Sequence, residues 1–133
     1  MKQIFASLLF CLLAAPCFGQ SQLAMNMQAD ADYQKADKEL NVTYQKILKE
    51  YQAKTTFIQN LKVAQKLWIQ FRDAEVKAKY PDAAQEYGSV FPTCWSQEMA
   101  DLTRARTKHL KIWLTGIREG DVCAGSVKTV ETK

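Results

Sequence analysis

The chain has 133 residues, 47% of them hydrophobic, which suits one small domain with a core of its own. Its 18 basic and 14 acidic residues give a formal net charge of +4. Such a mild positive charge favours solubility and excludes a dedicated binder of nucleic acid or of another polyanion.

Residues 1–19 have the pattern of a secretory signal peptide. Lys2 supplies the positive charge, an apolar run follows over residues 4–15, and small residues precede a predicted cleavage site between Gly19 and Gln20. We therefore expect the mature protein in the periplasm or outside the cell, where nucleic acid is not a natural partner.

Two alternatives to cleavage are weaker. An uncleaved anchor helix would need a longer apolar run to span a bilayer comfortably. Lipidation at Cys17 is disfavoured because a proline directly precedes that cysteine. No later segment approaches the roughly 18 apolar residues of a transmembrane helix, so no membrane span is expected.

Three amphipathic helices are expected over about residues 22–52, 57–79 and 94–115, because apolar side chains recur there at spacings of three and four. Thr93 is suited to cap the third helix, and Gly116 is suited to end it. Short connections between neighbouring helices predict an all-α fold, an antiparallel three-helix bundle with long helices.

The domain organisation follows from these helices. A helical domain is expected over residues 20–117. Residues 118–133 lack periodicity and are expected to form an irregular C-terminal tail.

Polar residues interrupt the inward-facing apolar stripe of each predicted helix. Six share this position: Asp37, Asn41, Gln65, Arg72, Thr103 and Arg106. At a rise of about 1.5 Å per residue, all six fall in one zone of an antiparallel bundle. Because buried polar groups must be paired, we interpret them as a structural layer in which Asp37 accepts hydrogen bonds from Arg72 or Arg106. The alternative is a site for an anionic ligand between the helices.

Four cysteines are present, of which Cys11 and Cys17 would leave with the signal peptide. In an exported chain the remaining pair, Cys94 and Cys123, suggests one disulfide. Within one chain, that bond requires the third helix to end by about Thr115, so that the tail can double back along it. A bond between two chains is the alternative.

Residues suited to catalysis or metal binding are scarce. His109 is the only histidine, which together with two remaining cysteines excludes an ordinary zinc site. The nearest carboxylate pair, Asp73 and Glu75, points to different faces of a helix. The sequence has no nucleophile elbow and no glycine-rich phosphate loop. We therefore expect neither a cofactor nor enzyme activity.

A group of lysines surrounds the predicted first turn of the bundle. Its members are Lys46, Lys49, Lys54, Lys62 and Lys66. A solvated cationic surface is the ordinary interpretation of such a group, and weak contact with an anionic envelope polymer is the alternative.

Three motifs resemble the LprI-like lysozyme-inhibitor N-terminal domain family. Residues 36–44 match its AD-x-x-LN-x-x-Y signature, and residues 64–75 match its AQ-x-x-W-x-x-(F/Y)-R-D-A-E segment. Residues 88–110 are similar to its closing GS…C…LT-x-x-R-T-x-x-L pattern. The predicted polar layer is part of these motifs. The family usually has cysteines at two positions held here by Gln28 and Val76, so the resemblance implies that the usual cross-links are absent and that Cys123 replaces them.

The resemblance implies an exported, non-enzymatic inhibitor of lysozyme or of another cell-wall hydrolase. Such an inhibitor would present a projecting loop, and the longest predicted loop spans residues 81–92. Its candidate contact residues are Asp82, Glu86, Tyr87 and Ser89. A positively charged inhibitor would meet a basic lysozyme slowly unless acidic residues cluster in that loop. The alternative is an envelope interaction, structural or immunity-type module that has a protein partner and no effect on lysozyme.

Overall fold

The computed structural model describes residues 17–131, and three long helices account for most of them. They are α1 (Cys17–Glu50), α2 (Thr55–Lys79) and α3 (Phe91–Leu110). No glycine or proline interrupts α1 between Gln20 and Glu50, which lets it run through 34 residues. The prediction of an all-α class is confirmed. The predicted signal peptide lies outside the described residues at positions 1–16, and residues 17–19 begin α1.

Four short elements complete the described chain. They are the 3₁₀ turn η1 (Ala84–Tyr87), the one-turn helix α4 (Ile112–Thr115) and the strands β1 (Ile117–Arg118) and β2 (Thr129–Val130). The two strands pair in parallel, with Ile117 opposite Thr129. The tail is therefore tied back onto the chain that follows α4, whereas the sequence predicted a wholly irregular segment.

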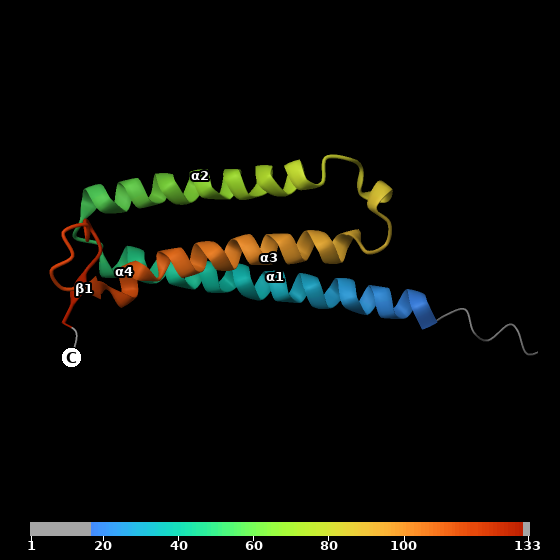
Figure 1. The fold of residues 1–133 in the computed structure, drawn as a ribbon, viewed down its shortest axis with the longest axis horizontal. Helices are drawn as coiled ribbons and strands as arrows, with labels where there is room; N and C mark the ends of the chain where they lie inside the picture. The colour runs from blue at the N-terminus through green and yellow to red at the C-terminus, as the bar shows by residue number, and fades with distance from the viewer. Residues whose placement is uncertain (1–16, 132–133) are drawn as a thin grey trace, which may run out of the picture.

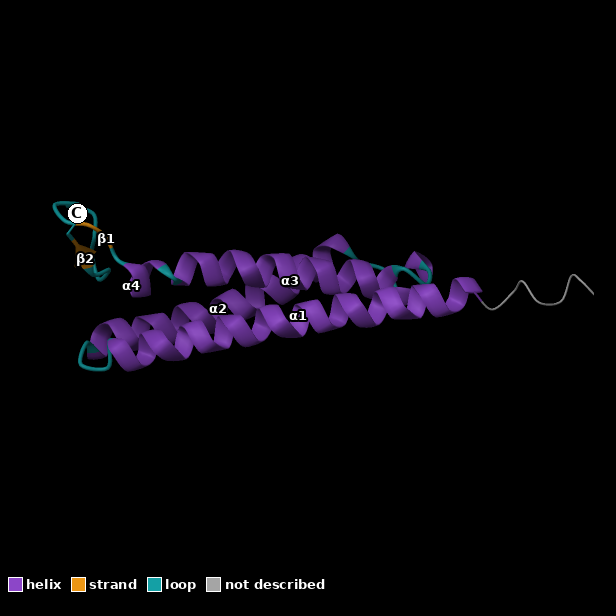
Figure 2. Ribbon diagram, turned by 90° about the horizontal axis from the view of Figure 1, so that it is seen from below, coloured by secondary structure: helices purple, strands orange, loops and turns teal. Residues whose placement is uncertain are grey.

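Figure 1 shows α1 and α3 side by side, with α2 running in the opposite direction. Figure 2, turned by 90°, again shows α1 and α3 adjacent. Alanines buried along this contact, Ala29 and Ala36 on α1 and Ala100 on α3, let the two helices approach closely. Because α2 packs less closely against this pair, an evenly packed antiparallel bundle stays a prediction. None of the helices in residues 17–131 is long and apolar enough to cross a membrane.

The main apolar core lies where α1 passes into α2 and where α3 ends. Its buried members are Leu40, Ile47, Tyr51, Leu61 and Leu110. The Tyr51 hydroxyl donates to the Trp113 carbonyl at 2.8 Å and accepts from the Lys128 backbone N–H at 3.2 Å. The Trp113 indole donates to the Ser126 hydroxyl at 3.0 Å. These hydrogen bonds fasten the tail over the core.

The start of α3 differs from the prediction. The helix begins at Phe91, with Pro92 in its first turn, where the missing N–H of proline costs little. Thr93 was expected to cap the helix but lies inside it, buried, and its hydroxyl donates to Asn26 Oδ1 on α1 at 2.6 Å. The capping role is therefore wrong, because tertiary contact with α1 uses this hydroxyl. The other end differs as well, because α3 ends at Leu110 and the one-turn helix α4 follows it. Gly116 ends α4 with a φ of +82°, a left-handed value that suits glycine.

Candidate functional site

The loop between α2 and α3 is built on a cluster of aromatic rings. Tyr87 stacks on Phe91 with ring centroids 5.2 Å apart, and Tyr80 meets these two rings edge-on at 5.5 and 5.4 Å. Trp95, one turn into α3, lies 5.7 Å from Phe91. Aromatic pairs of this kind each contribute about 0.5–1.5 kcal/mol beyond burial of area. The rings therefore give the loop a defined shape.

Hydrogen bonds fix the predicted contact loop further. The Tyr87 hydroxyl accepts from the Asp82 backbone N–H at 3.0 Å and donates to the Asp82 carboxylate at 3.2 Å. The Ser89 carbonyl accepts from Asn26 Nδ2 on α1 at 3.2 Å. Tyr87 and Ser89 thus hold the loop in place, while Asp82 and Glu86 are exposed on it.

A pocket of about 520 Å³ lies beside this loop, between α1 and α3. We call it the aromatic pocket, and its lining residues are Asn26, Asp30, Ala84, Phe91, Pro92, Trp95 and Ser96. Ala84 belongs to η1, so the loop forms part of the wall. Asp30 is exposed and forms no ion pair with any of the residues that the structure describes. The sequence motifs gave no sign of this pocket.

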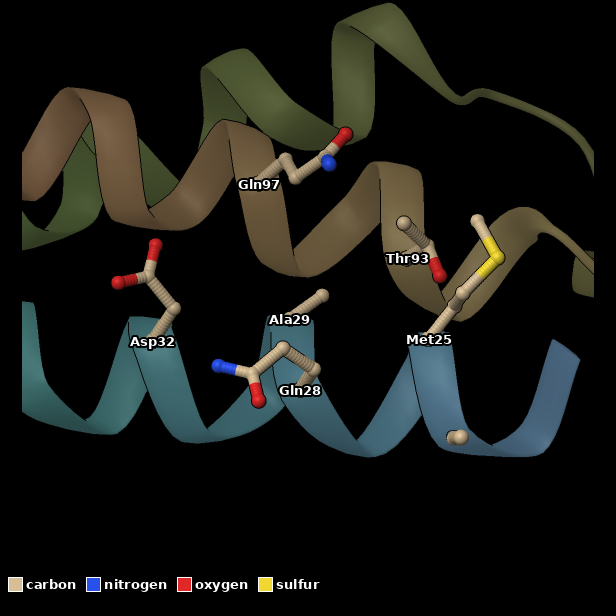
Figure 3. A pocket seen from close by; sticks show the side chains of 7 residues that line it. Met25, Gln28, Ala29, Asp32, Thr93 and Gln97 are labelled. Atoms are coloured by element: carbon tan, nitrogen blue, oxygen red, sulfur yellow. The ribbon is translucent and has the colours of Figure 1, made fainter. Parts of the chain in front are cut away.

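A second pocket, of about 540 Å³, lies on the other flank of the contact between α1 and α3. Figure 3 shows Met25, Ala29 and Asp32 extending from α1 toward Thr93 and Gln97 on α3. The carboxylate in this pocket is already neutralised, because Arg104 of α3 pairs with Asp32 at 2.5 Å. This pairing raises the pKa of Arg104, so that the guanidinium stays positively charged.

The predicted polar layer divides into two units. In the first, Arg72 is buried and pairs with its neighbour Asp73 through Nε at 2.9 Å and a terminal nitrogen at 2.8 Å. It reaches Asp37 only at 3.9 Å. Asn41 is exposed rather than inward-facing, and it donates to Asp37 at 2.9 Å. The expected pairing of Asp37 with Arg72 is present but weak.

The second unit joins α2 to α3. Arg106 donates through Nε to buried Gln65 at 3.0 Å and not to Asp37, and burial lowers its pKa. The Trp68 ring contacts both arginines, since the guanidinium carbons of Arg72 and Arg106 lie 5.3 and 5.8 Å from its centroid. Thr103 is fully buried and its hydroxyl has no hydrogen-bond partner among the residues that the structure describes. Neither pocket described above includes a layer residue, so its structural role stays our interpretation.

The two described cysteines are free. Cys94 is half-buried in the first turn of α3, whereas Cys123 is exposed in the tail. At about 1.5 Å per residue, α3 alone separates its two ends by about 30 Å, while a disulfide requires Cα atoms about 4.4–6.8 Å apart. The tail is fastened at the far end of α3 by the bond between Trp113 and Ser126. This corrects the prediction of a disulfide within one chain; a bond between chains stays a prediction.

A profile of the family described as Lysozyme inhibitor LprI matches residues 17–110, which include all three long helices and the loop. The chain belongs to the LprI lysozyme inhibitor family. An uncharacterized protein of Rhizobium meliloti (strain 1021) is 36% identical to it over 102 residues, covering 68% of this chain and 72% of that protein. No solved structure matches the chain.

This LprI family member has its charge strongly segregated along its length. Residues 20–34 and 72–104, which we call the loop end, hold eight carboxylates against two lysines and two arginines, a net of four negative charges. Residues 35–71 and 105–131, which we call the core end, hold twelve basic and six acidic side chains, a net of six positive charges. Figure 1 places these two ends at opposite sides of the long molecule. The overall charge of the LprI chain therefore hides two oppositely charged ends.

Several acids of the loop end are free to act on a partner. Asp30, Glu75, Asp82 and Glu86 form no ion pair within residues 17–131, whereas Glu98 is paired with Lys79. The sequence did carry a signal of this segregation, because residues 3–34 and 80–103 contain no lysine or arginine. The lysine group lies at the core end, where Lys46 and Lys49 line a shallow pocket of about 570 Å³ with Leu114.

Proposed function

We propose that this protein is an exported, non-enzymatic inhibitor of lysozyme or of another cell-wall hydrolase, and that its loop end meets the enzyme. Membership of the LprI family supports the class of activity. The predicted signal peptide supports export. The observation that carries the choice of surface is the negative loop end, with an ordered loop at its tip. An up-down-up arrangement of α1, α2 and α3 would serve as the scaffold that presents this loop.

The segregated charge removes the objection that a positive inhibitor repels a basic lysozyme. Association depends on the potential at the surfaces that face each other, and complementary patches raise the rate of encounter. With a net of four negative charges, the loop end would attract a basic enzyme, while the core end would face away from it. Asp82 and Glu86 would then contact the enzyme first.

The test measures lysis of cell-wall substrate by c-type, g-type and i-type lysozymes with and without the purified protein. The informative variant is Asp82→Lys/Glu86→Lys, which reverses two loop charges. Because it also removes the carboxylate that accepts from the Tyr87 hydroxyl, a second variant, Asp82→Asn/Glu86→Gln, keeps an acceptor there and separates charge from loop order. The matched control of the lysine variant is Glu119→Lys/Glu131→Lys, which changes net charge equally at the exposed core end. We expect the lysine variant of the loop to inhibit at least about tenfold less well at low salt, which corresponds to about 1.4 kcal/mol, and the control to inhibit normally.

Two outcomes would overturn this proposal. If the unaltered protein at high molar excess inhibits none of the three lysozyme types, the inhibitor function is wrong. If both lysine variants lose the same amount of inhibition, then overall charge and not the loop end directs binding. Circular dichroism of each variant confirms that the helices remain folded.

The alternative function is an envelope interaction module with a protein partner and no effect on lysozyme. One observation favours it: Val63, Leu67 and Phe71 follow one another along the outer face of α2, and each is 58% exposed. Exposed apolar patches of this kind mark interaction surfaces. A stable periplasmic partner that is lost on Leu67→Ser/Phe71→Ser, in a protein that inhibits no lysozyme, would select this alternative.

A further inference from the structure

We propose that the aromatic pocket receives an arginine side chain from the partner enzyme. The identity of the partner rests on the proposed function; the chemistry of the pocket rests on the structure alone. The loop and the pocket share a wall at Ala84, so a protein that contacts the loop also covers the pocket.

The pocket has a suitable size and lining. Its volume of about 520 Å³ falls within the range of about 300–1,000 Å³ typical of small-ligand sites. Like the pocket beside Lys46 and Lys49, it is shallow and open to solvent, so a side chain can enter from outside. Phe91, Pro92 and Trp95 make most of the wall apolar. A wall of this composition favours a flat group that stacks, such as an aromatic ring or a guanidinium.

The polar groups on the rim select the charge of that occupant. Asp30 supplies the single charged side chain of the pocket, and it has no ion pair within residues 17–131. Asn26 is already engaged, because its Oδ1 accepts from Gln22 and Thr93 while its Nδ2 donates to Ser89. The pocket therefore offers an unpaired carboxylate to a cation rather than a set of free amides to a neutral ligand.

Arginine fits these groups better than lysine does. A guanidinium can stack on the ring of Trp95 or on that of Phe91, which are inclined by 57° to each other, and at the same time donate two parallel hydrogen bonds to a carboxylate such as that of Asp30. A lysine ammonium is a compact, strongly hydrated point charge and cannot do both in one plane.

The chain uses the same chemistry within itself. Trp68 contacts the guanidinium groups of Arg72 and Arg106, at 5.3 and 5.8 Å from its ring centroid. On the other flank of the contact between α1 and α3, Asp32 is occupied by Arg104. Asp30 lies about half a helical turn from Asp32 and pairs with no arginine in the described part of the chain, so its carboxylate is available to an arginine of a partner.

A small probe tests the pocket without any enzyme. N-acetyl-arginine amide is titrated into the protein while the indole N–H resonance of Trp95, assigned with Trp95→Phe, is followed by NMR. The control probe is the citrulline derivative, which has the same shape and no charge. We expect the arginine probe to shift the resonance saturably and the citrulline probe to bind at least tenfold more weakly. Asp30→Asn should abolish the difference, and Glu75→Gln, which removes a loop-end charge outside the pocket, should preserve it.

Equal binding of the two probes, or an arginine shift unchanged by Asp30→Asn, would overturn the inference. Inhibition assays then separate it from the proposed function. If the arginine probe binds but lysozyme is not inhibited, the pocket stands and the inhibitor function fails. If lysozyme is inhibited equally well by the unaltered protein, Asp30→Asn and Trp95→Leu, the function stands and the pocket assignment fails.

Discussion

The core end and the loop end of this protein are built differently although the same helices run through both. At the core end, large side chains are fully enclosed, among them Ile47 and Leu110, and the tail covers them. At the loop end, Val76 and Met99 are buried but the other buried residues are small or polar, such as Ala29, Thr93 and Ser96, and aromatic rings stay partly exposed beside a pocket. Burial of apolar area stabilises a fold, so most of the stability is expected at the core end.

The charges divide in the same way as the packing. The core end is basic and the loop end is acidic, so both ends carry a net charge, and the negative one belongs to the part that contributes less to stability. Binding surfaces often lie in regions of sparse packing, because the residues there are not needed to hold the fold together. The difference suggests that stability and binding can be altered independently along the long axis of the molecule.

The largest expected effect is on stability, from Ile47→Ala. Ile47 is fully buried in the core cluster, and removing its side chain leaves a cavity that typically costs about 2–5 kcal/mol. Urea unfolding followed by circular dichroism measures the loss. Val63→Ala, at an exposed position on α2, is the control and should change little. Loss of lysozyme inhibition by an Ile47→Ala sample that is still fully folded would break the separation of the two ends.

A smaller loss is expected when the tail is loosened by Gly116→Ala. Gly116 has a φ of +82°, and an added Cβ would lie 2.8 Å from Val130 Cγ1 and 2.9 Å from the Lys128 carbonyl oxygen. Strained backbone of this kind costs about 1–3 kcal/mol. Gly120→Ala is a matched control, since its φ of +87° gives a similar backbone strain but no atom of the described residues lies within 4 Å of the added Cβ. The close contacts at Gly116 should therefore make Gly116→Ala the more destabilising change. Equal thermal shifts for both variants would mean that the tail does not press against Gly116.

Periodicity and glycine were enough to predict the helices. The recurrence of apolar residues located all three long helices, and Gly116 marked the end of α4, because both signals are local. The start of α3 was misplaced because Thr93 serves as a partner for Asn26, sixty-seven residues away, rather than as a cap. The strand pair at Ile117 was missed because two-residue strands carry no periodic pattern.

The candidate site was predicted only in part. The loop and its acids, Asp82 and Glu86, were identified from sequence, since turn residues mark loops. The pocket at Asp30 was not, because it requires two helices and η1 to meet at one place. The six polar residues were grouped because they lie at similar positions along the bundle axis. That position does not determine which acceptor each arginine binds, and Arg106 binds Gln65.

The smallest expected effect is at the boundary of the two ends, from Asp37→Ala. Arg72 keeps its close pair with Asp73 at 2.8 Å, whereas its contact with Asp37 is 3.9 Å long and 38% of the Asp37 side chain is exposed. Partly exposed pairs of this kind contribute about 0–1 kcal/mol, so we expect a slightly lower melting temperature and unchanged inhibition. Gln65→Ala should lower the melting temperature more, because it leaves the half-buried Arg106 without its acceptor. If Asp37→Ala instead loses inhibition at unchanged stability, the polar layer is part of the binding surface. The boundary between the binding part and the stabilising part of the molecule would then lie closer to the apolar core.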